Sequence, residues 1–175
     1  MPRPSEIVYR LFEAQEPDDQ YSPEILITGI APAHLKAAFD VFRTRSASLG
    51  STDYIWHKAQ ARGLPLAECP DPIALVVSGE GEEFHVLFHG LASGDAQLPL
   101  VGAFVWCAEE AGGLRLHYYV SERYNCDDEW TDAAIDGLFD LLANVQRLAP
   151  EATIAYDLNL PADQRSAFDA ALRLV

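Results

Sequence analysis

Apolar and polar residues follow a strand-like pattern along four segments in the middle of the chain. From Leu114 to Val120 every second residue is apolar, which predicts a strand with one buried face. Ile73–Ser78, Phe84–Gly90 and Leu100–Cys107 are likewise rich in β-branched, aromatic or other apolar residues. Because short loops that contain glycine or proline join these segments, we expect four consecutive antiparallel strands.

A helical period dominates three other stretches. Apolar residues recur on one side of a helix in Trp130–Leu148, in the segment from Pro32 that ends before Gly50, and around Phe168 near the C-terminus. A fourth, shorter helix is predicted over Asp53–Arg62, because serine and threonine precede it as possible caps and a glycine follows it.

The remaining segments complete the predicted architecture. Glu24–Ile30 and Thr153–Leu158 are expected to be strands, and Ile7–Phe12 is either a strand or a short helix. The 175 residues suffice for one core, so residues 1–175 are predicted to form a single domain. The expected class is α/β of the α+β type, with a mixed, mostly antiparallel sheet flanked by helices.

The order of these elements resembles the GNAT acetyltransferase fold, with the best match over residues 73–175. In that family the loop after the strand at Leu114–Val120 is rich in glycine, and its N–H groups hold the pyrophosphate of coenzyme A. Here residues 121–129 contain no glycine and end in Asp127, Asp128 and Glu129. The family's Asn is matched by Asn159, but Phe168 lies where a catalytic Tyr is expected.

These departures define two alternatives for chemistry. The degenerate GNAT-like topology predicts no catalytic centre and no cofactor, because three carboxylates at a helix N-terminus would repel a diphosphate. The alternative is a GNAT-like N-acyltransferase that uses acetyl-CoA or another acyl-CoA through an atypical loop.

The charge of the chain restricts its partners. Lys and Arg number 12 against 27 Asp and Glu, a formal net charge of −15, and neither Lys nor Arg occurs between Arg62 and Arg115. Nucleic acid and anionic membranes are therefore not expected as partners, whereas a basic protein is. The alternative is that the charge only keeps the chain in solution.

The histidines and cysteines bear on a possible metal site and on the cellular location of the chain. His85, His89 and His117 would converge, with Cys107 as a further donor, only if their strands were neighbours in a matching register, so no metal site is predicted. The cysteines form no Cys-x-x-Cys pair, and the N-terminus has no apolar signal core, which makes the cytoplasm the expected location.

The long helix carries an acidic ridge, by which we mean Asp132, Asp136 and Asp140, spaced four residues apart. Each such pair repels by about 0.2–0.5 kcal/mol, and no structural benefit is evident from the sequence. The ridge, with Glu129 and Tyr124, is therefore predicted to contact a basic protein, although a merely solvated helix face would look the same. The leading prediction is an acidic cytoplasmic binding protein, similar to an immunity protein or another inhibitor.

Overall fold

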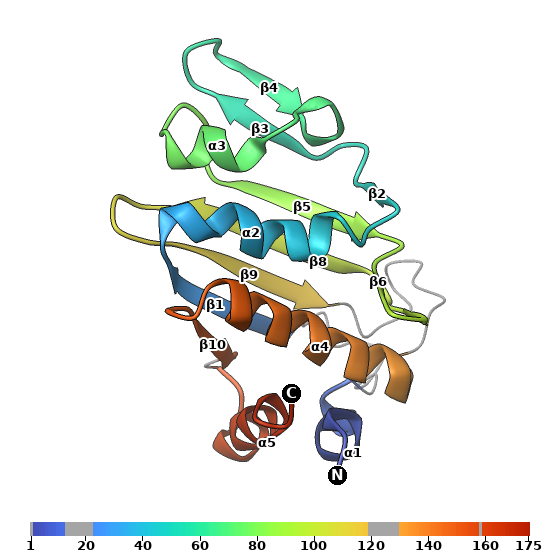
Figure 1. The fold of residues 1–175 in the computed structure, drawn as a ribbon. Helices are drawn as coiled ribbons and strands as arrows, with labels where there is room; N and C mark the ends of the chain where they lie inside the picture. The colour runs from blue at the N-terminus through green and yellow to red at the C-terminus, as the bar shows by residue number, and fades with distance from the viewer. Residues whose placement is uncertain (1, 13–22, 119–129, 158) are drawn as a thin grey trace.

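The computed structural model describes residues 2–12, 23–118, 130–157 and 159–175, and a six-stranded antiparallel sheet lies at its centre (Figure 1). In spatial order the strands are β10 (Thr153–Tyr156), β1 (Glu24–Ile30), β9 (Gly112–Tyr118), β8 (Val101–Cys107), β5 (Phe84–His89) and β2 (Ser48–Leu49). Each neighbouring pair in this sheet is antiparallel. The predicted α+β class is confirmed.

Helices α2 (Pro32–Arg43) and α4 (Asp132–Leu148) pack on one face of the sheet (Figure 1). Both begin where the sequence favours a helix, since Pro32 occupies the first turn of α2 and the Thr131 side chain accepts a hydrogen bond from the Ala134 N–H at the start of α4. Helices α1 (Pro4–Val8) and α5 (Ala162–Leu172) contact each other beyond β10, near the two termini. A 3₁₀ turn, η1 (Tyr9–Leu11), follows α1, so the helical alternative for the N-terminal segment is the correct one.

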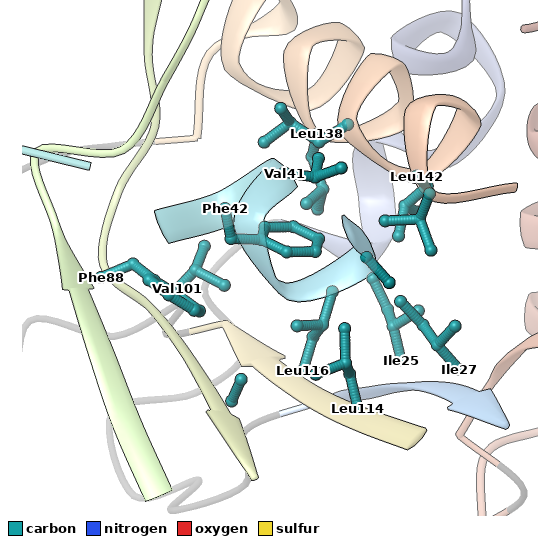
Figure 2. Packing of buried hydrophobic residues seen from close by; sticks show 14 of the residues in the cluster. Ile25, Ile27, Val41, Phe42, Phe88, Val101, Leu114, Leu116, Leu138 and Leu142 are labelled. Carbon is teal, nitrogen blue, oxygen red and sulfur yellow. The ribbon is translucent and has the colours of Figure 1, made fainter. Parts of the chain in front are cut away.

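The core lies between these helices and the sheet (Figure 2). Ile25 of β1 and Leu116 of β9 point toward the layer formed by α2 and α4, as the period of two predicted for β9. The Phe42 ring of α2 stacks against Phe88 of β5 with 5.7 Å between ring centres. The amphipathic stripes of α2 and α4 are thus what cover the buried face of the sheet.

The helix predicted over Asp53–Arg62 is wrong. This segment forms the hairpin of β3 (Tyr54–His57) and β4 (Arg62–Pro65), in which exposed Tyr54 and Trp56 alternate with buried Ile55 and His57. The outer edge of β3 is paired as well: the Lys58 N–H donates to the Glu80 carbonyl, and the Glu82 N–H donates to the Trp56 carbonyl. Pairing with a segment more than 20 residues away outweighs the local capping signals.

The strand predicted over Ile73–Ser78 is also wrong, because Pro72–Val77 form helix α3. The Asp71 side chain caps this helix by accepting a hydrogen bond from the Ala74 N–H at 3.0 Å, and Pro72 takes the first helical position. Ile73 and Val76, three residues apart, are buried on one side. The antiparallel meander therefore has three strands, β5, β8 and β9.

Three smaller elements complete the description: η2 (Leu66–Glu68), β6 (Ala92–Ser93) and β7 (Ala96–Gln97), the last two forming a short hairpin. Among the described helices, none has the length and apolar character needed to cross a membrane.

Candidate functional site

The acidic ridge lies along the outer side of α4, and two of its carboxylates are used inside the chain. Asp136 Oδ1 accepts a hydrogen bond from the Ser5 N–H of α1 at 2.8 Å. The Arg3 guanidinium lies 3.5 Å from Asp132 and 3.6 Å from Asp136. The ridge thus has a structural benefit that the sequence did not reveal, because it holds the N-terminal helix against α4.

The other predicted contact residues differ in position. Asp140 is exposed on the same helix, and Glu129 and Tyr124 lie outside the described residues. A role of this surface in binding a partner stays a prediction.

Asp136→Ala is expected to lower the free energy of unfolding by about 1–2 kcal/mol, because it removes a charged acceptor from the Ser5 N–H and one contact of Arg3. Asp140→Ala on the same helix is the matched control and is expected to change stability by less than about 0.5 kcal/mol. Urea unfolding followed by circular dichroism measures both. Equal effects of the two variants would contradict a structural role for Asp136.

A cleft lies between the β3–β4 hairpin and the ends of β5 and β8. Its volume is about 360 Å³, and it is lined by Thr52, Asp53, Tyr54, Trp56, Glu82, Glu83, Phe84, His85 and Phe104. His85 and Phe104 project from the face of the sheet opposite to α2 and α4, since their neighbours Val86 and Val105 are buried on the helix side. The cleft and the acidic ridge therefore belong to opposite sides of the sheet.

Two further hollows adjoin this cleft. One shares Tyr54 and Trp56 with it and continues to Gly63 and Pro65 on β4. The other shares Glu82 and Glu83 with it and continues past Lys58 to Trp106 and Cys107. We call these three adjoining hollows, which share lining residues, the hairpin groove.

Aromatic side chains stand open to solvent in the hairpin groove. Tyr54 is 57% exposed and Trp56 is 39% exposed, which is unusual for rings of this size. Phe104 and Trp106 lie next to each other on β8, with ring centres 6.3 Å apart. The groove thus offers several flat apolar surfaces that a partner could cover.

Carboxylates accompany these rings. Glu82 and Glu83 are exposed, while Asp53 Oδ2 accepts a hydrogen bond from the Leu87 N–H at 2.7 Å and so fixes the hairpin to β5. The residues that line the central cleft include no Lys or Arg, and Lys58 lies in the adjoining hollow. The central cleft is therefore acidic as well as aromatic.

Two imidazoles meet on the groove side of the sheet, and one of them, His85, lines the central cleft. His85 Nε2 and His117 Nε2 are 2.9 Å apart, a hydrogen bond in which one ring donates and the other accepts. The register pairs His85 with Phe104 and His117 with Gly102, so the two rings meet diagonally across β8, and any Cβ at Gly102 would collide with the His117 ring. Burial, and secondarily the charge of His85, lowers the pKa of His117 to about 4.

The other two side chains considered as possible metal donors, His89 and Cys107, lie elsewhere. His89 pairs with Ser48 at the far end of β5, and Cys107 pairs with Gly112 at the end of β8. Within the described parts of the chain, no group of three or more His, Cys, Asp or Glu side chains is placed to hold a metal ion. Two of the three imidazoles thus lie together, an arrangement that the sequence left open, and the expectation of no metal stays a prediction.

The residues singled out by the GNAT resemblance give no catalytic arrangement among the described residues. Phe168 is buried, with its ring stacked 4.9 Å from that of Tyr156, and so belongs to the core. The possible cofactor loop, residues 121–129, lies outside the described residues. The resemblance and the absence of an acyl-CoA cofactor stay predictions.

The hairpin groove was missed at the sequence level. Tyr54 and Trp56 fell in the segment predicted as a helix, although their alternation with Ile55 and His57 was a signal of period two. The absence of Lys and Arg between residues 62 and 115 did indicate an acidic surface in this half of the chain.

Comparison with known proteins gives little further information. No family model matches the chain, and no curated protein is similar to it in sequence. A solved structure, the toxic C-terminal tip of CdiA from Pseudomonas aeruginosa in complex with an immune protein, contains a chain that is 13% identical. The match covers 73% of this chain and 76% of that one, with a TM-score of 0.44. At this similarity the match supports no inference about family, partner or activity.

Proposed function

We propose that this chain is an acidic cytoplasmic protein that binds and neutralises a basic protein, in the manner of an immunity protein or another inhibitor, without a catalytic centre or cofactor. The observation that carries the proposal is the hairpin groove, in which exposed Tyr54 and Trp56 stand beside exposed Glu82 and Glu83. Exposed aromatic rings next to charged groups are typical of protein interfaces rather than of small-molecule pockets.

The two kinds of side chain have different roles in such an interface. Rigid aromatic rings bury a large area at a small cost in conformational entropy, and therefore supply most of the binding free energy. Carboxylates accelerate the encounter with a basic partner and select against acidic ones. The net charge of −15 strengthens this steering at low salt.

The hairpin groove is a better candidate for the main contact than the acidic ridge. Asp132 and Asp136 already face Arg3 and the N-terminal helix, so part of the ridge's charge is neutralised within the chain. Asp140, together with Glu129 and Tyr124, is proposed as a secondary contact.

The proposal is tested by cross-linking the chain to its partners in the native host and purifying the complexes. The wild-type chain is expected to recover a protein of net positive charge, with an association rate that falls steeply as salt rises. The double variant Glu82→Gln/Glu83→Gln should associate more slowly and depend less on salt, whereas the control Asp140→Asn should change the rate much less. An acidic partner, or equal rates for wild type and double variant, would contradict the proposal.

A further inference from the structure

We infer that the hairpin groove recognises the guanidinium groups of arginine side chains, and not positive charge in general. This inference rests on the proposed function and specifies the chemistry by which the same groove selects its partner. It follows from the placement of Trp56 beside Glu82, from an equivalent arrangement already occupied within the chain, and from the geometry of arginine.

The backbone fixes Trp56 and Glu82 opposite each other. The Glu82 N–H donates to the Trp56 carbonyl at 3.0 Å, and the next pair, His57 and Gly81, forms an antiparallel bridge. Residues directly opposite in an antiparallel pair have Cβ atoms about 4.5–5.5 Å apart and lie on the same face. An indole surface and a carboxylate are therefore held side by side, and both line the cleft.

Tyr54 extends this surface. It lies two residues before Trp56 on β3 and so shares the exposed face of the strand. Its ring packs over Gly63 of β4, where any larger side chain would displace it. The two rings thus stand in a row along the hairpin.

The chain contains an occupied example of this combination on the same face of the sheet. The guanidinium of Arg115 lies 6.0 Å from the centre of the Phe104 ring, while its Nε lies 3.7 Å from a carboxylate oxygen of Glu24. One arginine thereby contacts an aromatic ring and a carboxylate at once. Trp56 and Glu82 present the same two groups to the solvent side of the groove.

Arginine fits this arrangement better than lysine. A guanidinium is planar and weakly hydrated, so it can stack on a ring while its N–H groups point in the plane toward a carboxylate. The ammonium group of lysine is a strongly hydrated point charge and gains little from a flat ring once water competes. A groove with rings beside carboxylates therefore favours arginine-bearing segments.

Binding of hexa-arginine and hexa-lysine, two peptides of equal charge, tests this inference. Titration is followed by calorimetry and by tryptophan fluorescence at roughly 50 and 300 mM NaCl, because high salt suppresses the nonselective attraction. Hexa-arginine is expected to bind at least tenfold more tightly than hexa-lysine, with the ratio maintained or increased at the higher salt concentration. Trp56→Ala should lower the affinity for hexa-arginine to that for hexa-lysine. Trp56→Phe should restore part of the difference between the two affinities.

Matched controls separate the groove from the rest of the acidic surface. Tyr9→Ala removes another exposed ring, from η1, and Asp163→Asn removes an exposed carboxylate from α5, which lies beyond β10. Both controls should keep the preference for hexa-arginine, whereas Glu82→Gln should lower the affinity for hexa-arginine several-fold. Circular dichroism confirms the fold of each variant.

Three results of these titrations would overturn the arginine inference. Equal affinities for the two peptides, or an unchanged preference in Trp56→Ala, would overturn the arginine inference and leave the general preference for a basic partner standing. Failure of both peptides to bind would overturn the inference as well, and recovery of complexes from the native host would then decide the proposed function by itself.

Discussion

Phe42→Ala is expected to lower the free energy of unfolding by about 3–5 kcal/mol, because it removes a large ring from the centre of the core. The Phe42 side chain is 0% exposed, and it lies between α2 and the sheet against Phe88 (Figure 2). Its neighbours belong to different strands and helices, so they cannot close the resulting cavity without moving the sheet relative to α2. Urea unfolding, followed by circular dichroism, measures the loss.

Two controls accompany this variant. Phe42→Leu keeps much of the volume and should cost clearly less than Phe42→Ala. Tyr54→Ala removes a ring of similar size from the exposed side of the hairpin and should cost less than about 1 kcal/mol. A loss below about 1.5 kcal/mol for Phe42→Ala would show that this ring is not part of a tightly packed core.

Acidification is expected to destabilise the fold through His117. Its pKa in the folded chain is lowered to about 4, against about 6.5 for an ordinary imidazole, so the unfolded chain takes up a proton at a higher pH than the folded chain does. Stability from this residue is therefore present above pH 6.5 and is lost as the pH falls from 6.5 toward 4. From this difference in pKa, the free energy of unfolding is expected to fall by up to about 2 kcal/mol between pH 7 and pH 5. Solvent screening of the ring makes the loss smaller.

Urea unfolding at pH 7, 6 and 5 tests this expectation in two histidine variants. His117→Asn should lose less stability than the wild type on acidification, whereas His89→Asn, at an exposed position of β5, should follow the wild type. Glu24 lies opposite His117 on β1, and Arg115 lies on the same face, so a proton titration of the His117 ring by NMR gives the net effect of these charges. The same pH dependence in wild type and His117→Asn would refute the assignment.

Elements whose stability is encoded locally could be predicted from the sequence. Strands β1, β5, β8 and β9 and helices α2 and α4 have an amphipathic period that matches their burial. Asp53–Arg62 and Ile73–Ser78 were assigned wrongly because their local signals compete with tertiary ones. The first segment pairs with residues 80–82, and the second is a short helix that depends on one capping aspartate.

The candidate site could be predicted only in part, because its residues are brought together from distant parts of the chain. His85 and His117 meet across β8, where Gly102 opposite His117 leaves room for the His117 ring, and no sequence pattern gives that register. Asp136 finds its partner Ser5 at a distance of 131 residues along the chain. What the sequence did contain was the acidic composition of the segment from 62 to 115, since charge does not depend on register.

The position of the hairpin groove has a geometric consequence for any complex. Helix α4 covers one face of the sheet (Figure 1), whereas the side chains of His85 and Phe104 line the groove on the other face. A rigid partner seated against Trp56 is thus separated from Asp140 by the full thickness of the sheet and of the helical layer that covers it. Only a partner that wraps around the edge of the sheet could engage both surfaces, so a compact one leaves the outer side of α4 free for a second molecule.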